Sequence, residues 1–333
     1  MELNILEYEE YREKCDRDEV ILGVIDKQDT EILKTYNRTI RNGRLCIRKL
    51  YHDNITRNVE EMARLHMRLQ ELQHEFDDFL KHTAEIYEVF MVKMQDGSLS
   101  ACILEEYIQG ETIAEKLKKK QADFERHSSE YALDHRARLR YPPRIGFKEE
   151  EVIDIMIQLC TVLRILHWNE TKILHRDIKA TNVMITDYGD ISKLIDFDIA
   201  RIPKYNTYSQ TEDTYVAFTR GFGAPEQYGI EPTGEETDIY TIGVLMHLML
   251  VGYEEHDHIK GDSPFYSRHR RIKYHGNLRD IIDKCTQAVK KDRYSSAWSL
   301  ELDLRKARYA SCGFLACKEK YCIDPLHWPP IKM

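Results

Sequence analysis

Residues 173–200, which read ILHRDIKATNVMITDYGDISKLIDFDIA, constrain this chain more than any other stretch. The triplet His175-Arg176-Asp177 is followed by Lys179 and Asn182, and an Asp-Phe dipeptide begins fourteen residues after Asn182, at Asp196. A His-x-Asp triplet alone is weak evidence, because aspartate is also common in turns. The conjunction of these residues predicts a loop that carries chemistry.

The composition favours a soluble protein with two lobes or domains. The chain has 333 residues, more than most single cores hold, and is 42% hydrophobic and 32% charged. Its net charge of −8 argues against nucleic acid or an anionic membrane as a partner. The acidic start lacks the features of a signal peptide, no run is long enough to span a membrane, and most cysteines lie in apparent core segments. We therefore expect a cytoplasmic protein.

The first hundred residues have the pattern of short strands around one long helix. Apolar residues recur three and four positions apart from Met62 to Phe79, which predicts a helix over residues 57–81. We prefer a helix packed on a sheet to a coiled-coil dimer, since coiled coils usually sustain more heptads. An Asp-Gly turn at residues 95–98 predicts a hairpin between the last two strands. The predicted strands span residues 20–25, 31–36, 45–50, 86–94 and 99–108.

After Gly110 the predicted elements are mostly helical. An amphipathic pattern predicts a helix over residues 148–168, directly before the charged loop, and residues 121–147 have the composition of an exposed polar insertion. Strands with one helix, followed by a mostly helical half, indicate an α+β fold with a small antiparallel β lobe and a large helical lobe. The other predicted helices span residues 112–120, 236–251, 278–290 and 297–310. The expected domains are residues 1–108, residues 109–310 and a cysteine-rich tail at residues 311–333.

The charged loop resembles the catalytic loop of the protein kinase family. The resemblance implies that Asp177 accepts the proton of the substrate hydroxyl and that Lys179, as in serine/threonine kinases, neutralises the γ-phosphate. It also implies that Asn182 and Asp196 bind Mg²⁺, which bridges to the phosphates. The cofactors implied are therefore ATP and Mg²⁺.

Further residues match landmarks of that family in the right order. Ala224-Pro225-Glu226 resembles the motif that closes the activation segment, and Gln227 after it is common in bacterial kinases. The resemblance makes Asp238 a buried aspartate that holds the catalytic loop, and Arg293 the partner of Glu226; a buried charge must be paired to be tolerated. The resemblance runs from about residue 20 to residue 310.

In the first half of the chain the resemblance is looser. Lys49 is the lysine expected to contact the α- and β-phosphates, whereas Arg48 faces the other side of its strand and is expected in solvent. The glutamate partner of Lys49 stays open between Glu71 and Glu75, which lie one helical turn apart.

The next segment resembles a kinase hinge. It reads Glu106-Tyr107-Ile108, and the resemblance implies that backbone groups at Glu106 and Ile108 hold the adenine. The preceding residue, Glu105, then occupies the gatekeeper position, where a charged side chain is unusual.

Two features depart from the family pattern. No glycine lies between Gly23 and Gly43, and the glycine-rich loop is replaced by a turn at residues 26–30 that contains aspartate. We expect weaker ATP binding or a rearranged loop as a result. Asp198 stands where the family carries glycine, and aspartate is among the few other residues that enter the left-handed region with modest strain. We therefore expect Asp198 to change the mobility and local charge of the segment without removing the metal site.

Two further segments carry candidate residues. The resemblance places Arg176 where it would pair with a phosphorylated residue of the activation segment, and Thr219 where it would contact Asp177 and Lys179. The candidate phosphorylation sites are Thr207, Ser209, Thr211 and Thr214. The tail offers either a zinc site or free thiols packed on the large lobe, and its equal spacings of five do not match usual zinc motifs. The residues concerned are Cys312, Cys317, Cys322 and His327.

The sequence thus predicts a bacterial-like serine/threonine protein kinase whose partners are protein substrates. A pseudokinase or weakly active scaffold is the alternative, because of the missing glycines and Asp198. A small-molecule kinase of related fold is a third reading, but such enzymes usually lack Lys179 and the Ala-Pro-Glu segment. The oligomeric state stays open.

Overall fold

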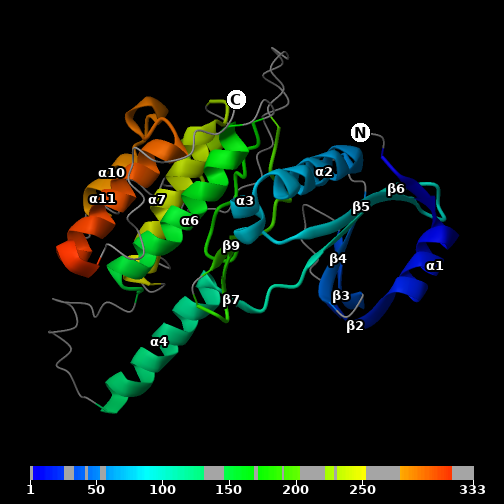
Figure 1. Ribbon diagram of the computed structural model, residues 1–333, viewed down its shortest axis with the longest axis horizontal. Helices are drawn as coiled ribbons and strands as arrows, with labels where there is room; N and C mark the ends of the chain where they lie inside the picture. The colour runs from blue at the N-terminus through cyan, green and yellow to red at the C-terminus, as the bar shows by residue number, and fades with distance from the viewer. Residues whose placement is uncertain are drawn as a thin grey trace.

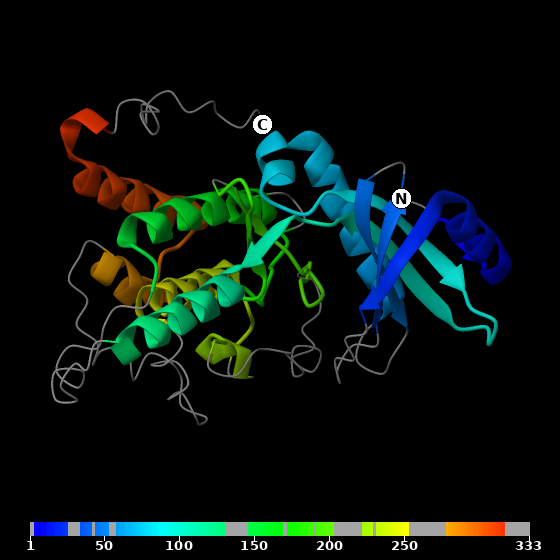
Figure 2. The ribbon, with the colours of Figure 1, turned by 90° about the horizontal axis from the view of Figure 1, so that it is seen from below.

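The computed structural model describes residues 3–25, 34–41, 44–52, 58–130, 146–168, 172–189, 191–202, 222–228, 231–252 and 278–316. A β-sheet flanked by helices forms one end of the molecule, and a mostly helical part forms the other (Figure 1, Figure 2). The predicted α+β architecture, with strands and a helix first and a mostly helical part after them, is confirmed. Within the part of the chain described, no helix combines the length and the apolar character needed to cross a membrane.

Six strands form the sheet, in the order β1-β5-β6-β4-β3-β2. β1 (Ile5–Glu7) runs parallel to β5 (Ile86–Lys93), and every other neighbouring pair is antiparallel. The predicted hairpin between β5 and β6 is confirmed, and Gly97 in its turn has a φ of 83°, which glycine adopts without strain. The other strands are β2 (Glu19–Ile25), β3 (Lys34–Arg41), β4 (Arg44–His52) and β6 (Leu99–Glu106).

Helix α1 (Tyr8–Asp18) covers one face of this sheet and was not predicted. Its Tyr11 and Cys15 form a buried apolar cluster with Phe90 and other residues of β5 and β6. Arg48 of β4 lies under this helix, only 4% exposed, with its guanidinium carbon 5.6 Å from the centre of the Tyr11 ring. The prediction of a solvated Arg48 is therefore wrong, because α1 supplies an aromatic cover that cation–π attraction favours.

Helix α2 (Val59–Glu75) packs on the opposite face of the sheet, as expected. The side chain of Asn58 caps it by accepting a hydrogen bond from the N–H of Glu60 at 2.8 Å. The predicted single helix over residues 57–81 is wrong in one respect. The backbone is extended at Phe76, with φ −129° and ψ 107°, so the helix stops there and resumes as α3 (Asp77–Lys81). The predicted apolar stripe is buried at Met62, Leu65, Leu69, Leu72 and Phe79.

A small second sheet joins the two parts of the molecule. It consists of β7 (Gly110–Thr112), β8 (Val183–Thr186) and β9 (Ser192–Leu194). β7 leads into α4 (Ile113–Glu130), which extends ten residues further than predicted. The first part of the expected polar insertion is thus helical, and local pairs such as Gln121 with Glu125 at 2.9 Å support it.

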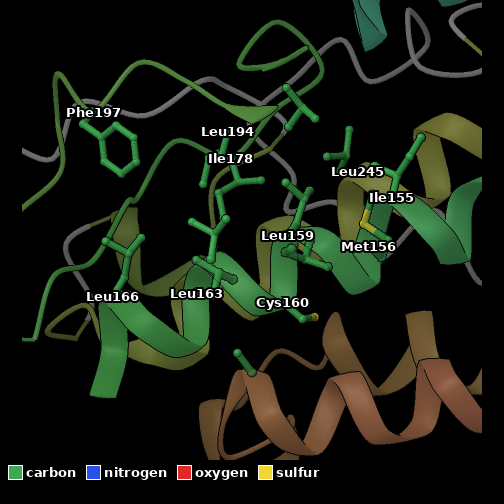
Figure 3. Close-up of a cluster of buried hydrophobic side chains, with 14 of the residues drawn as sticks. Ile155, Met156, Leu159, Cys160, Leu163, Leu166, Ile178, Leu194, Phe197 and Leu245 are labelled. Carbon is green, nitrogen blue, oxygen red and sulfur yellow. The ribbon is translucent and has the colours of Figure 1, made fainter. Parts of the chain in front are cut away.

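Helix α6 (Glu149–Trp168) is the centre of the helical part and carries the loop that holds the site. It packs against α7 (Glu235–Val251) and α11 (Ala297–Ala316), while α10 (Leu278–Cys285) packs on α7. Apolar side chains of α6 belong to one buried cluster with residues that follow the helix in the chain, among them Ile178, Leu194 and Phe197, as Figure 3 illustrates. The predicted buried face of α6 is confirmed, and the loop that holds the site packs against it.

Candidate functional site

The loop at residues 175–177 is held from below by Asp238 of α7. This fully buried carboxylate accepts hydrogen bonds from the backbone N–H groups of His175 at 3.0 Å and Arg176 at 2.7 Å. It also accepts one from Nε2 of His167 at 2.9 Å. Arg176 has a φ of 68°, a left-handed conformation that costs a non-glycine residue energy. These bonds offset that strain, which is the holding function predicted for Asp238.

Burial alone would raise the pKa of the Asp238 carboxyl. The hydrogen bond and charge of His167 and the N–H of Arg176 outweigh this effect, so the pKa lies below its ordinary value. Asp238 is therefore an anion over the physiological pH range, and its charge supports the loop.

Asp177, Lys179 and Asn182 meet above this support. Nζ of Lys179 lies 2.7 Å from Oδ2 of Asp177, and Nδ2 of Asn182 donates to the same oxygen and to the backbone carbonyl of Asp177, both at 3.0 Å. The side chain of Asp177 is 15% exposed. The arrangement gives an oriented carboxylate at the edge of solvent with a cation beside it, which is suited to accepting a proton from a bound hydroxyl.

Asp196 approaches the loop from the end of β9. The N–H of Ile195 donates to the carbonyl of Asn182 at 2.9 Å, which joins the two segments. The rings of His175 and Phe197 are 4.8 Å apart, so the residue after Asp196 is also in contact with the loop. Asp196 has a φ of 66°, a conformation that aspartate tolerates better than most residues.

The donor set of Asp196 and Asn182 fits Mg²⁺, which commonly takes one or two protein oxygens and completes its shell with phosphates and water. Among the described residues no group of three or more His, Cys, Asp or Glu side chains is arranged for a metal, so a site made entirely of protein ligands is not seen there. The tail residues considered for zinc lie outside the described side chains.

Asp198 does not occupy the left-handed region, so the tolerance of aspartate for that conformation is not used here. The positive φ angles of non-glycine residues in the described chain are those of Arg176 and Asp196. Asp198 is instead buried, and its Oδ1 accepts a hydrogen bond of 2.6 Å from Oη of Tyr51 on β4. Tyr51 is itself 1% exposed. Through this hydrogen bond the side chain of Asp198 ties the end of the Asp-Phe-Asp segment to the sheet.

Asp198→Gly, which introduces the glycine usual in the family, is expected to lower the free energy of unfolding by about 1–3 kcal/mol, because the buried Tyr51 hydroxyl loses this acceptor. Urea unfolding measures the loss. The same substitution made in a Tyr51→Phe background should cost clearly less. Equal costs in both backgrounds would contradict the role given to the hydrogen bond.

Lys49 is buried and forms an ion pair with Glu105 of β6, with Nζ 2.6 Å from Oε1. Neither glutamate considered from the sequence is its partner. Glu71 pairs with Arg68 on α2 at 2.8 Å, and Glu75 is exposed at the end of α2. Both alternatives are therefore wrong, because these side chains lie off the helix face that packs on the sheet.

The predicted hinge lies between the two parts of the molecule. The carboxylate of Glu106 accepts a hydrogen bond from Nζ of Lys193 on β9 at 2.8 Å. The backbone N–H of Glu106 donates to the carbonyl of Glu85. The N–H of Tyr107 donates to the carbonyl of Leu45. Ile108 is 6% exposed, and within the described residues its N–H donates to no backbone carbonyl.

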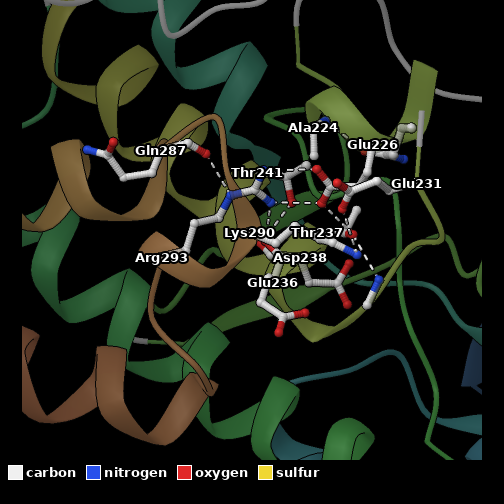
Figure 4. Close-up of polar contacts among 12 residues, drawn as sticks. Ala224, Glu226, Glu231, Glu236, Thr237, Asp238, Thr241, Gln287, Lys290 and Arg293 are labelled. Carbon is white, nitrogen blue, oxygen red and sulfur yellow. Dashed lines mark hydrogen bonds and ion pairs between the residues drawn. The ribbon is translucent and has the colours of Figure 1, made fainter. Parts of the chain in front are cut away.

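The Ala-Pro-Glu segment is anchored on the helical part, as Figure 4 shows. Glu226 forms a bidentate ion pair with Arg293 at 2.7 and 2.9 Å and accepts a hydrogen bond from Thr237 at 2.8 Å. Burial would raise the pKa of Glu226, but Arg293 and Thr237 keep it below its usual range. The spatial pairing expected for Glu226 and Arg293 is thus present.

Gln227 contributes a link that was not predicted. Its amide nitrogen donates to the carbonyl of Arg176 at 2.9 Å, and its amide oxygen accepts from the N–H of Ala224 at 2.9 Å. The Ala-Pro-Glu segment is thereby joined to the strained residue before Asp177. The only sequence signal for this link was the presence of glutamine after the motif.

Three sets of predicted residues lie outside the described residues. They are the turn at residues 26–30, the activation-segment candidates Thr207, Ser209, Thr211, Thr214 and Thr219, and the tail from Cys317 onward.

Because His175 and His82 are buried, the free energy of unfolding is expected to fall on acidification. Burial lowers the pKa of His175, although the carboxylates of Asp238, Asp177 and Asp196 oppose the effect. Burial likewise lowers the pKa of His82, whose Nδ1 hydrogen-bonds the carbonyl of Ser192. As the pH falls through about 6.5, the unfolded chain binds protons at both rings before the folded chain does, so stability falls as the pH falls.

Each histidine should remove up to about 1.4 kcal/mol of unfolding free energy per pH unit below pH 6.5. Urea unfolding at pH 7.5, 6.5 and 5.5 measures this slope, and a His82→Gln variant should show a shallower one. A midpoint that stays constant from pH 7.5 to 5.5 would rule the effect out.

The amino-acid sequence of this chain is similar to those of known proteins. The sequence profile of the protein kinase domain matches residues 12–303. The chain is 32% identical over 126 residues to the probable serine/threonine-protein kinase PknB of Corynebacterium glutamicum, covering 38% of this chain and 19% of that protein. It is 28% identical over 216 residues to serine/threonine-protein kinase A of Synechocystis, covering 57% of this chain and 35% of that protein. The chain thus spans well under two thirds of the length of these relatives.

Proposed function

Because the chain belongs to the protein kinase family, we propose that it transfers the γ-phosphoryl group of ATP to a serine or threonine hydroxyl of a protein. The observation that carries this proposal is the oriented carboxylate of Asp177, held by Asn182 and flanked by Lys179 above the buried Asp238. The names of the relatives and the presence of Lys179 two residues after Asp177 favour a serine or threonine acceptor.

The residues of the site divide the work as follows. When bound, Mg-ATP supplies the γ-phosphorus, which forms a bond to the acceptor oxygen as its bond to the departing ADP oxygen breaks. Asp177 takes the proton that the acceptor hydroxyl loses. Lys179 and Lys49 place positive charge beside the phosphates, and Asp196 with Asn182 would hold the metal. Backbone groups at Glu106 and Ile108 would hold the adenine.

A protein that binds nucleotide weakly and acts as a scaffold is the second candidate. The specific observation in its favour is the absence of glycine between Gly23 and Gly43, where the family usually brings backbone N–H groups to the phosphates.

Incubation of the purified chain with γ-labelled ATP, Mg²⁺ and a general serine-rich protein substrate tests the proposal. Label is expected on the substrate or on the chain itself, as phosphoserine or phosphothreonine. In parallel, Mg-ATP at about 100 times its Kd should stabilise the fold by about 2.7 kcal/mol, which a thermal shift detects without turnover. Stabilisation without label would favour the scaffold. The absence of both label and stabilisation would refute both candidates.

A further inference from the structure

Lys49 and Glu105 meet because of the register of two neighbouring strands. β4 and β6 are antiparallel, with Lys49 opposite Ile103 and Ile47 opposite Glu105. Residues two apart on a strand share a face, so Lys49 and Glu105 are diagonal neighbours on the same side of the sheet. Their ion pair of 2.6 Å is buried, with side-chain exposures of 6% and 10%.

Helix α2 brings no carboxylate to this place. The residues that it turns toward the sheet are apolar or neutral polar ones: Val59, Met62, Ala63, Leu65, His66, Leu69, Leu72 and Gln73. Its acidic residues lie on other faces, where Glu60 pairs with Arg64 and Glu71 with Arg68. The carboxylate of Glu105, which does contact Lys49, comes from the sheet.

Glu105 shares a cavity wall with the predicted metal ligand Asp196. Glu105 lines a small cavity between α2 and the site together with His66, Leu69, Asp196 and Phe197. A carboxylate at this point can fix the direction of the Lys49 ammonium group, because a charge-assisted hydrogen bond is short and directional.

We propose that Glu105 is the positioning residue of Lys49, in the place where the family resemblance led us to expect a glutamate on helix α2. The proposal rests on the proposed function, since it concerns the lysine that faces the phosphates. Both partners belong to hydrogen-bonded strands, so the direction of Lys49 is set within the sheet and does not depend on where α2 lies. This role accounts for the acidic side chain of Glu105 at the gatekeeper position, where a charged side chain is unusual.

The test measures the Kd of Mg-ATP by calorimetry, and KM and kcat where turnover occurs. Glu105→Gln keeps the size of the side chain and removes its charge, and should weaken Mg-ATP binding by about 10- to 100-fold, the factor for losing one charge-assisted hydrogen bond. Glu105→Asp should recover most of the affinity. Glu71→Gln and Glu75→Gln are matched controls and should bind as the unchanged chain does.

A double-substitution cycle separates positioning from a general structural role. If Glu105 acts through Lys49, Glu105→Gln should change binding by no more than about twofold when Lys49→Met is already present. Each variant is measured below its own melting temperature, checked by circular dichroism. Should Glu105→Gln fail to fold, Glu105→Met, which also removes the charge, replaces it in the same cycle with the same expected sign of effect.

Several outcomes overturn the proposal. Equal losses from Glu105→Gln with and without Lys49 would make Glu105 merely structural. If Glu71→Gln or Glu75→Gln weakened Mg-ATP binding and Glu105→Gln did not, the residue that positions Lys49 would lie on α2. The proposed kinase function would not be affected by that result. Binding without phosphoryl transfer would defeat the proposed function, yet the affinity cycle would still decide the role of Glu105. An unchanged chain that binds no Mg-ATP would defeat both.

Discussion

Asp177→Asn is expected to lower the rate of phosphoryl transfer by about 10²- to 10⁴-fold, the range that general-base groups contribute. The asparagine has nearly the shape of the aspartate and can still accept a hydrogen bond from Asn182, so the loop should keep its form. It cannot take a proton, and it no longer pairs with Lys179. Because the nucleotide-facing groups are unchanged, the affinity for Mg-ATP should change little. Single-turnover phosphorylation with labelled ATP measures the loss.

The matched control is Asp187→Asn, an exposed aspartate in the turn between β8 and β9 of the same segment. It should transfer phosphate at the rate of the unchanged chain. If Asp177→Asn retained activity within about twofold of this control, then Asp177 would not be the base, because even the low end of general-base catalysis exceeds that difference.

Arg293→Met is expected to lower the free energy of unfolding by about 3–5 kcal/mol. The guanidinium is fully satisfied in the fold: it contacts both oxygens of Glu226 and the carbonyls of Gln287 and Glu236, and it lies 4.8 Å from the centre of the Tyr240 ring. Removing it leaves the carboxylate of Glu226 charged in a site where it is about 2% exposed. The cost arises from this uncompensated charge more than from the lost attraction, and urea unfolding at pH 7 measures it.

Two comparisons make this prediction specific. Lys306→Met removes a surface pair with Asp303 and should cost less than about 1 kcal/mol. The double variant Arg293→Met with Glu226→Met removes both charges, so it should be more stable than Arg293→Met alone. A double variant that is less stable than the single one would show that the penalty has another origin.

Much of the helical part could be predicted from the sequence, because its signals are local. The stripe on α6 and the short motifs around Asp177 and Glu226 each occupy one continuous stretch. The resemblance then indicated which distant partners to expect, and Asp238 and Arg293 lie where the expectation put them. A charged side chain that becomes buried needs a partner of opposite charge, so both members of such a pair can be expected from the sequence.

Contacts that depend on strand register could not be predicted in the same way. Lys49 meets Glu105, and Tyr51 meets Asp198, only because β4 pairs with β6 and lies over the end of the Asp-Phe-Asp segment. Helix spacing suggested Glu71 and Glu75 instead, since it says which residues share a helix face but not which face meets the sheet. Arg48 shows the same limit, because its burial is caused by α1, an element the local pattern did not reveal.

The added strand β1 also bears on how the protein can be produced. A chain shortened to begin where the kinase-domain profile begins, at residue 12, would lack β1 and the Tyr11 that packs on Phe90. β5 would then become the edge of the sheet, with an unpaired row of N–H and C=O groups beside newly uncovered apolar side chains. Such edges recruit strands from other molecules and cause aggregation. The solubility of a shortened chain is therefore expected to depend on whether it keeps residues 5–11, which precede the region that the profile matches.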